Sequence, residues 1–382
     1  MTVTAPQGFR SSGVAAGLKE DALDLALVVN DGPLYVASGR FTANRVQAAP
    51  VIWSKQVLAA AKVRAVVLNS GGANACTGSE GFANVHHTAE AIARELGCSA
   101  AEVAVCSTGL IGEQLPIELL LDAIPESVQD LSDRSAEEAA EAILTTDTVA
   151  KTAVRDNGEW TIGAMAKGAG MLAPSLATML VTITTDALID SATANVALEE
   201  ACRYTFDRLD ADGSMSTNDT VLLLASGASG FEADAEEFTA ELTALCHDLA
   251  QQILADAEGS TKDISIAVVN AASEDDAVDV GRAIARDNLV KTALFGSDPN
   301  WGRILAAVGT SDAKFQADDI DVAINGVVVC QQGAAAQTRR QVDISERAVD
   351  ITIDLHVGEH NATVWTNDLS HTYVHENSAY SS

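Results

Sequence analysis

The segment KGAGMLAPSLATMLVTITTDA, residues 167–187, places a threonine at the point where a loop becomes a strand. From Met179 to Thr184, apolar side chains alternate with a period of two, which predicts a β-strand with both faces at least partly buried. The residues before it include two glycines and a proline, so the chain approaches this strand through a permissive segment. Thr178 stands at the junction, and a hydroxyl there could act as a nucleophile if a base lay beside it.

One way to supply that base is to make Thr178 the first residue of a chain, so that its own α-amine accepts the proton. An α-amine titrates near ~7.7 to 8.0, against ~10.4 for lysine, and is partly unprotonated at neutral pH. Thr178 is internal, so this chemistry requires cleavage of the Ala177-Thr178 bond. The threonine oxygen can attack the Ala177 carbonyl, so that the peptide bond is replaced by an ester. Water then hydrolyses this ester and releases Thr178 as a new N-terminus. The ordinary alternative is a β-branched residue at the start of a strand.

Composition limits the classes of partner. The chain has 382 residues, of which 47% are hydrophobic, enough for one large unit or two domains. Its formal net charge of −31 comes from 54 acidic and 23 basic residues. Such a charge opposes binding to phosphate backbones and to anionic membranes. We therefore expect neither nucleic acid nor a membrane as a partner.

Targeting and metal signals are weak. No apolar stretch approaches the ~20 residues of a membrane span, and the first residues lack the pattern of a signal peptide, so a cytoplasmic location is expected. The six cysteines show no CxxC pair or metal-finger spacing, which favours reduced thiols. His86 and His87 have no third ligand at metal spacing. We predict no metal and no cofactor.

Strand and helix patterns are intermixed along the chain, without an internal repeat. Residues 64–78 and 102–116 each read as a buried strand followed by a glycine-containing loop. Residues 236–254 have the apolar spacing of an amphipathic helix, and residues 263–285 read as strand, acidic cap and helix. Asn325-Gly326 predicts a hairpin, and DITIDLHV with ATVWTND predicts a second one. These patterns favour an α+β layered sandwich over a doubly wound parallel sheet.

A series of motifs along the whole chain resembles the ornithine acetyltransferase family of arginine biosynthesis. The motifs, in that family's order, are APQGFRSSGVAAGLK, FTANRVQAAPV, NSGGANACTG, CSTGLIGEQLP, ILTTDT, KGAGMLAPSLATML, STNDTVLLLASG, DAEGSTK, LVKTALFGSDPNWGRI and ENSAYSS. The resemblance implies a layered αββα sandwich with mixed and antiparallel sheets. It also implies a self-cleaving precursor, cut before Thr178 into an α-chain of residues 1–177 and a β-chain of residues 178–382 that stay associated.

The resemblance also assigns roles to single residues. Thr108 and Gly109 would form the oxyanion hole, through a hydroxyl and a backbone N–H. The residues that would contact the substrate, besides Thr178, are Thr146, Lys167, Glu258, Asn377 and Ser382. A lysine suits an α-carboxylate, and a glutamate suits the cationic side chain of ornithine. Taken alone, these would be a turn, a surface lysine, an acid at a helix end and a frayed tail.

Two further motifs receive only a structural role: STNDT, with Asn218 and Asp219, and FGSDPNWGR, with Trp301 and Arg303. One position departs from the family. Gly72 in NSGGANACTG stands where many relatives have asparagine, which makes the side-chain contacts of this loop uncertain. Neither the nucleophile nor the oxyanion pair is affected.

The resemblance implies acetyl transfer by double displacement through an acetyl-Thr178 ester, from N-acetylornithine to glutamate. Whether acetyl-CoA also serves as donor stays open. Two other readings of the same residues remain: a self-activating aminopeptidase or amidase with water as acceptor, and an uncut, non-enzymatic binding protein. Family habit predicts an oligomer of cleaved protomers.

Overall fold

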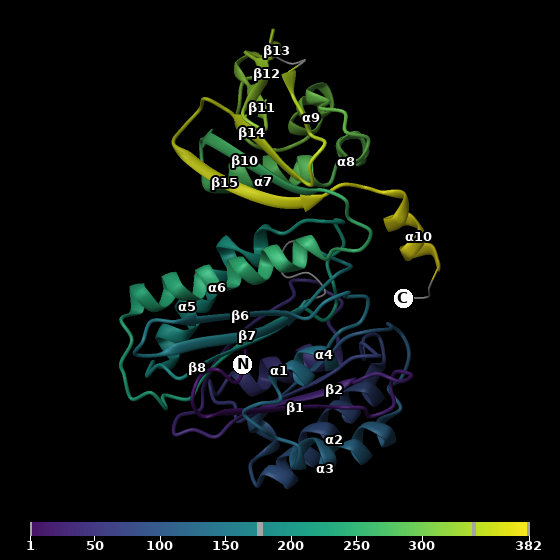
Figure 1. Cartoon of the computed structure of the whole chain (residues 1–382), viewed down its shortest axis with the longest axis vertical. Helices are drawn as coiled ribbons and strands as arrows, with labels where there is room; N and C mark the ends of the chain where they lie inside the picture. Colours follow the sequence, from purple (N-terminus) through teal and green to yellow (C-terminus); the bar gives the residue numbers. More distant parts are fainter. Residues whose placement is uncertain (1, 174–178, 338–340, 380–382) are drawn as a thin grey trace.

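Two β-sheets form the centre of the larger part of the molecule (Figure 1). The computed structural model describes residues 2–173, 179–337 and 341–379. The first sheet contains β1 (Phe9–Val14), β2 (Leu25–Asn30), β4 (Ala65–Asn69) and β5 (Val103–Ser107), in the order β1-β2-β4-β5. The second contains β3 (Val36–Phe41), β6 (Lys151–Asp156), β7 (Thr161–Lys167), β8 (Leu180–Thr185) and β9 (Thr220–Ala225), in the order β3-β9-β8-β7-β6.

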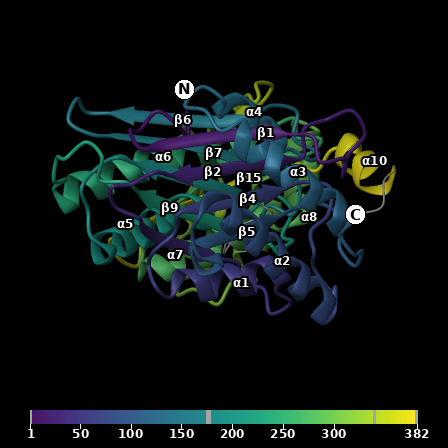
Figure 2. The ribbon, with the colours of Figure 1, turned by 90° about the horizontal axis from the view of Figure 1, so that it is seen from below.

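Helices cover the outer faces of both sheets. The helices of this part are α1 (Ala49–Leu58), α2 (Gly78–Leu96), α3 (Ile117–Gln129), α4 (Ala136–Ala142), α5 (Ser191–Tyr204) and α6 (Ala235–Ala255). Helices α2 and α3 lie over the first sheet (Figure 2), and their buried side chains pack on it. Those of α5 and α6 pack on the second sheet. A third apolar cluster joins the two sheets. The predicted layered αββα sandwich is therefore confirmed.

Helix α6 shows how local sequence produces one of these layers. Its side chains at spacings of three and four, from Phe238 to Ile253, are buried against the second sheet, as the periodicity predicts. The Asp234 side chain accepts hydrogen bonds from the N–H groups of Glu236 and Glu237, which are among the donors that a helix start leaves unpaired. The acidic residues between the apolar positions, Glu241 and Asp248, are partly exposed.

Strand β8 lies in the middle of the second sheet, and all six of its residues are buried. It runs antiparallel to β7, with Leu180 opposite Lys167, and parallel to β9, with Leu180 opposite Thr220. The predicted strand after Thr178 is thus confirmed. Strands from both sides of position 177 build this one sheet, so the predicted α-chain and β-chain share a continuous hydrogen-bonded layer.

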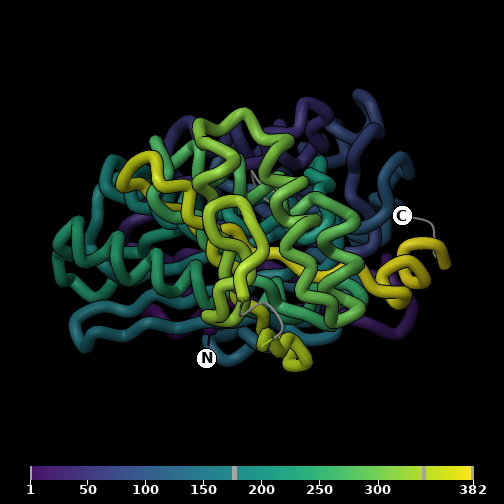
Figure 3. The backbone as a smooth tube through the Cα atoms, turned by 90° about the horizontal axis from the view of Figure 1, so that it is seen from above, coloured from purple at the N-terminus to yellow at the C-terminus, as the bar shows by residue number. Residues whose placement is uncertain are grey.

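The C-terminal part forms a separate, smaller lobe above the sandwich (Figures 1 and 3). Its strands are β10 (Asp263–Ala271), β11 (Asp321–Ile324), β12 (Val327–Gln331), β13 (Ala334–Ala335), β14 (Ala348–Asp354) and β15 (His360–Asn367). Its helices are α7 (Glu274–Ala285), α8 (Asn288–Phe295) and α9 (Trp301–Val308). The sheet order is β13-β12-β11-β14-β10-β15, with its own apolar core.

Of the two predicted hairpins, one is confirmed and one is wrong. Asn325 and Gly326 both have positive φ, 47° and 76°, and join the antiparallel strands β11 and β12. By contrast, β14 and β15 do not pair with each other, because β10 lies between them. The loop after β14 crosses the end of β10, and the N–H groups of Val357 and Gly358 donate to the carbonyl of Asn270.

Helix α10 (His371–Ala379) follows β15 and lies beside the sandwich, away from the lobe sheet (Figures 1 and 3). None of its residues is buried. Ser370, just before it, donates from Oγ to the carbonyl of Gly259 at 2.5 Å. In the described part of the chain, no helix is both long and apolar enough to cross a membrane.

Candidate active site

Strand ends of the two sheets come together near the start of β8. The N–H of Met179 donates to Oδ1 of Asp219 at 3.1 Å, and Asp219 directly precedes β9. The neighbouring Asn218 donates from Nδ2 to the carbonyls of Ser107 (2.8 Å) and Ala73 (2.6 Å), both in the first sheet or its loops. The predicted cleavage site, Ala177 and Thr178, lies outside the described residues, as does Ser382. Met179 is the nearest described neighbour of the predicted nucleophile.

The STNDT motif thus joins three segments around that point, which agrees with its predicted structural role. Burial raises the pKa of Asp219 well above its usual value, while the N–H of Met179 and the Lys167 ammonium act in the opposite direction. Asp219 is a buried titratable group bonded to Met179, the residue that follows the candidate nucleophile in the sequence. Sequence reasoning did not single it out for chemistry.

Thr108 and Gly109 directly follow β5. The Thr108 residue is 1% exposed, and its Oγ1 has no hydrogen-bond partner among the described residues. A buried hydroxyl without a partner normally costs stability, so such a group is a candidate for ligand contact. Gly109 has φ of +130°, a conformation that L side chains rarely adopt, and a Cβ there would lie 2.5 Å from the N of Gly72. This geometry leaves one donor hydroxyl and one glycine N–H at the same turn.

The glycine-rich loop after β4 supports that turn. Gly72 forms β-bridges with Thr108 and Leu110. The Asn69 side chain accepts a hydrogen bond from Ser107 Oγ (2.6 Å) and donates to the carbonyl of Gly72 (3.1 Å). The position where this chain departs from many relatives is therefore in direct contact with the oxyanion candidates. Gly72 makes this contact through its backbone.

Two predicted substrate contacts, far apart in the sequence, converge on a third, Glu258. Thr146 Oγ1 donates to Oε1 of Glu258 at 2.7 Å, and Asn377 Nδ2 of α10 donates to Oε2 at 2.9 Å. A Cβ on Gly170 would lie 2.6 Å from Oε1 of Glu258, so a larger residue there would push this carboxylate out of its position. The structure brings Thr146, Glu258 and Asn377 together, and their contact with a substrate stays a prediction.

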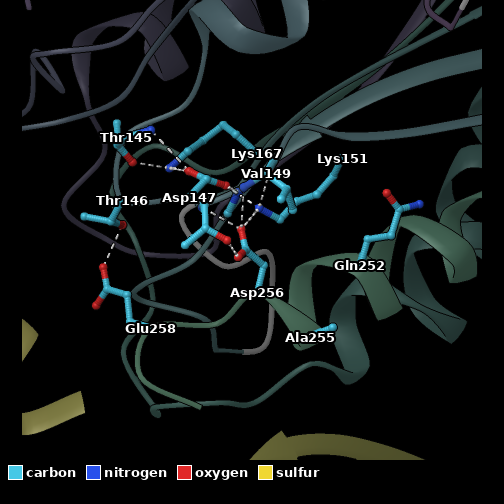
Figure 4. Close-up of polar contacts among 12 residues, drawn as sticks. Thr145, Thr146, Asp147, Val149, Lys151, Lys167, Gln252, Ala255, Asp256 and Glu258 are labelled. Carbon is cyan, nitrogen blue, oxygen red and sulfur yellow. Dashed lines mark hydrogen bonds and ion pairs between the residues drawn. The ribbon is translucent and has the colours of Figure 1, made fainter. Parts of the chain in front are cut away.

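Lys167 lies at the end of β7, next to Thr145 and Asp147 (Figure 4). Its Nζ donates to Oγ1 of Thr145 at 2.7 Å and lies 3.4 Å from Oδ2 of Asp147. The same Asp147 accepts from the N–H of Gly168 at 2.6 Å. Lys167 is 1% exposed, and it stands directly opposite the first residue of β8. It is therefore a buried cation at the start of β8, and not the surface lysine that its sequence context alone would suggest.

A second buried lysine completes a cluster of four charges. Lys151 Nζ donates to Asp147 Oδ1 (2.7 Å), to Asp256 Oδ2 (2.5 Å) and to the carbonyl of Val149 (3.2 Å). The side chains of Lys151 and Asp147 are both 0% exposed. Burial opposes ionisation of Asp147, but the ammonium groups of Lys167 and Lys151 outweigh it and hold the pKa of that carboxyl well below its usual range.

The three threonines of ILTTDT each have a separate partner, and that of Thr146 is Glu258, another predicted substrate contact. Thr145 Oγ1 accepts from Lys167, and Thr146 donates to Glu258. Thr148 donates to Asp256 from both its N–H and its hydroxyl. Sequence reasoning missed Asp147, Lys151 and Asp256. A signal was present in Asp147 itself, because it stands inside a motif already marked for substrate contact.

A cavity of about 210 Å³ opens beside this cluster. Its lining includes Thr146, Asp256, Glu258 and Ser260. The Glu258 carboxylate lines this cavity, and the Lys167 ammonium bonds Thr145, the neighbour of the lining residue Thr146. A carboxylate suits the ammonium of a zwitterionic ligand, and an ammonium suits its carboxylate. Among the described residues, no group of three or more His, Cys, Asp or Glu side chains could hold a metal ion.

Comparisons with known proteins agree over the whole length. The ArgJ family matches residues 10–382. "Arginine biosynthesis bifunctional protein ArgJ" of Streptomyces avermitilis is 59% identical over 383 residues, covering 100% of both chains. The protein of that name from Mycobacterium tuberculosis is 56% identical, covering 100% of this chain and 96% of its own.

Solved structures with similar sequences match about half of this chain. The arginine biosynthesis bifunctional protein ArgJ of Bacillus halodurans is 36% identical, with a TM-score of 0.50, over 52% of this chain and 97% of that one. The ornithine acetyltransferase of Mycobacterium tuberculosis, solved in complex with ornithine, is 56% identical, with a TM-score of 0.45, over 45% of this chain and 94% of that one.

Proposed function

The chain belongs to the ArgJ family and is an acyltransferase of arginine biosynthesis, and on this basis we propose that it transfers an acetyl group from N-acetylornithine to glutamate. The observation that carries the choice of substrate is that the adjacent residues Thr145 and Thr146 bond two opposite charges, the buried Lys167 ammonium and the Glu258 carboxylate. N-acetylornithine has an α-carboxylate for the first and a side-chain ammonium for the second. A relative solved with ornithine supports this choice.

In the proposed reaction, Thr178 Oγ1 attacks the acetyl carbonyl carbon while the α-amine of Thr178 takes the hydroxyl proton. The oxyanion that forms would accept hydrogen bonds from the Thr108 hydroxyl and the Gly109 N–H. The bond to the ornithine nitrogen breaks, that nitrogen takes the proton, and ornithine leaves. Glutamate then attacks the acetyl-Thr178 ester through its α-amine, releasing N-acetylglutamate and regenerating the hydroxyl. The acyl group is carried by the chain itself, so this route needs no cofactor.

The α-amine exists only after cleavage of the Ala177-Thr178 bond, so self-cleavage into residues 1–177 and 178–382 is part of the proposal. The Bacillus halodurans match supports it, because 97% of that solved chain corresponds to only 52% of this one. Denaturing mass spectrometry should find two fragments, the second beginning at Thr178. Thr178→Ala should stay one chain of 39.6 kDa and be inactive. A wild-type protein that stays whole and still transfers acetyl groups would refute the base assignment.

Product analysis tests the transfer. With N-acetylornithine alone, the processed enzyme should release one ornithine per site and then slow, with the acetyl group on the fragment that begins at Thr178. Added glutamate should restore turnover and yield N-acetylglutamate in equal amount. Rapid release of free acetate without glutamate would instead identify a hydrolase. An assay with glutamate and acetyl-CoA alone decides whether acetyl-CoA is also a donor.

We further propose that the two fragments remain one unit and that these units form a cytoplasmic homo-oligomer. The shared second sheet supports the association of the fragments, because β8 and β9 pair with β3 and β7 across the cut. Native mass spectrometry of the processed protein measures both the pairing and the number of units.

A further inference from the structure

The buried cluster of Lys151, Lys167, Asp147 and Asp256 is electrically balanced, with two ammonium groups and two carboxylates. Its contacts are uneven. Asp147 lies 2.7 Å from Lys151 Nζ but 3.4 Å from Lys167 Nζ. Asp256 also pairs with Lys151, at 2.5 Å. Both carboxylates therefore have Lys151 as their closest cation.

Lys151 and Lys167 differ in how completely their donors are used. The three N–H groups of Lys151 have three acceptors at 2.5 to 3.2 Å. Lys167 has only Thr145 Oγ1 at hydrogen-bond distance and Asp147 at 3.4 Å, counting acceptors within the described ranges. An ammonium carries three donors, so among the described residues at least one donor of Lys167 has no acceptor and is a candidate for contact with a ligand.

Removing the Lys151 charge would change this balance. The cluster would then contain two carboxylates and one ammonium, all nearly buried. Lys151 would no longer compete with Lys167 for Asp147. Charges interact strongly at this spacing because little water screens them. Lys167 would be drawn toward Asp147, and its field at the ligand would be offset by the uncompensated carboxylate.

We propose that Lys151 is a positioning residue of the active site: by neutralising Asp147 and Asp256, it leaves the Lys167 ammonium available to the α-carboxylate of the substrate. Lys151 itself is fully buried and does not reach the ligand. It thereby sets the preference of the enzyme for substrates with a free carboxylate. This inference rests on the proposed role of Lys167 in binding that carboxylate.

The test compares N-acetylornithine with its α-carboxamide, which has the same shape but no negative charge. For the processed wild type, the ratio of kcat/KM for acid over amide should be about tenfold or more, as expected for a charge-assisted contact. In Lys151→Met this ratio should fall by about fivefold or more. An unchanged ratio, with Asp147 taking up a proton instead, would overturn the proposal.

Lys262→Met is the matched control. Lys262 is also a buried lysine with three acceptors, the carbonyls of Ile344, Ser345 and Glu346 at 2.6 to 3.0 Å. Losing it should destabilise the protein in the same way but leave the acid-over-amide ratio unchanged. A similar fall of the ratio in Lys262→Met would show that the effect in Lys151→Met is general loosening.

A charge-balanced variant separates electrostatics from folding. Lys151→Met combined with Asp256→Asn removes one charge of each sign, so the ratio should recover relative to Lys151→Met although a second core residue is changed. Asp256→Asn alone leaves an excess positive charge and should raise the ratio above the wild-type value. Asp256→Asn alone tests the proposal even if Lys151→Met fails to fold. A fall of the ratio in Asp256→Asn would refute it.

Lys167→Met distinguishes this inference from the proposed function. If Lys167 binds the carboxylate, Lys167→Met should abolish the acid preference. Retention of the preference in Lys167→Met would refute the proposed role of Lys167. Loss of the preference in Lys167→Met, together with its full retention in Lys151→Met, would refute only the role of Lys151.

Discussion

At the residue scale, Thr108 combines two properties that rarely coincide. Its hydroxyl is buried, and within the described part of the chain it has no partner, so it contributes nothing to internal hydrogen bonding. The adjacent Ser107 is the opposite case, because its Oγ donates to Asn69 at 2.6 Å. Of these two neighbouring hydroxyls, that of Thr108 is therefore a candidate catalytic donor and that of Ser107 a structural one.

We predict that Thr108→Ala lowers kcat by ~10²-fold or more while KM changes little, because the lost donor acts on charge that develops in the transition state. Thermal stability should be nearly unchanged, since no internal hydrogen bond is lost. Ser107→Ala is the control and should lower stability by about 1 kcal/mol with little effect on kcat. Steady-state kinetics on the processed proteins would show the assignment to be wrong if Thr108→Ala kept wild-type turnover.

Glu258 should affect the two substrates differently. Glu258→Gln keeps the shape of the side chain but removes the charge that attracts the ornithine ammonium, so KM for N-acetylornithine should rise by about tenfold. Glutamate has a carboxylate at the end of its side chain, so its KM should stay the same or fall. Separate measurement of the KM values for N-acetylornithine and glutamate decides whether Glu258 acts on the ornithine ammonium. A comparable rise in both would mean that Glu258 acts on a group common to both substrates.

At the element scale, the sequence predicted what local patterns encode. The helix at α6 follows from apolar spacing, and the β11-β12 hairpin follows from Asn325-Gly326, since both signals lie within the element itself. The failed hairpin of β14 and β15 shows the limit. Both strands pair with β10, whose residues precede β14 by more than seventy positions, and nothing in the connecting loop indicates that third strand.

The same limit applies to the site. Thr108, Lys167, Glu258 and their companions were predicted because motifs contain them. The buried partners of Lys167 were not, because an ion cluster depends on which segments fold together. Asp256 belongs to the end of α6 and Lys151 to the edge strand β6, and only the packing of α6 on the second sheet brings them within 2.5 Å.

Helix α10 gives a prediction of its own. It has no buried residue and is tied to the site through Asn377 and Glu258. A chain that ends at Glu376 should fold and cleave before Thr178, but its transfer efficiency should fall about tenfold or somewhat more, because neutral hydrogen bonds contribute ~0.5 to 1.5 kcal/mol each. Asn377→Ala in the full chain should reproduce part of the loss. Wild-type kcat/KM in the shortened chain would show that the tail is not involved.

At the scale of the whole molecule, polar contacts join the lobe to the sandwich. Lys291 of α8 is 5% exposed, and its Nζ donates to the carbonyls of Ala211 and Asn367 and to Oγ1 of Thr366. The N–H of Ala211 donates in turn to the carbonyl of Leu172 in the KGAGML segment. The lobe is thus connected through one loop to the segment that precedes the candidate nucleophile.

This interface should give a pH-dependent stability. Burial lowers the pKa of Lys291 from 10.5 to about 8, although the nearby carboxylates oppose the shift. Between these values the folded protein binds fewer protons than the unfolded chain, so the stability from this group rises with pH. The unfolding free energy of the wild type, minus that of Lys291→Met, should increase by about 1 to 2 kcal/mol from pH 7.5 to 9.5. A constant or shrinking difference in urea titrations would contradict the shift.

The position of β10 between β14 and β15 also affects how the protein is made. A ribosome that adds roughly 5 to 20 residues per second completes β10 several seconds before either neighbouring strand exists. During that time both edges of a strand rich in isoleucine and valine are unpaired, which is the condition under which nascent chains associate with one another. Successful synthesis of the lobe therefore depends on keeping β10 apart from other copies until the last strands emerge.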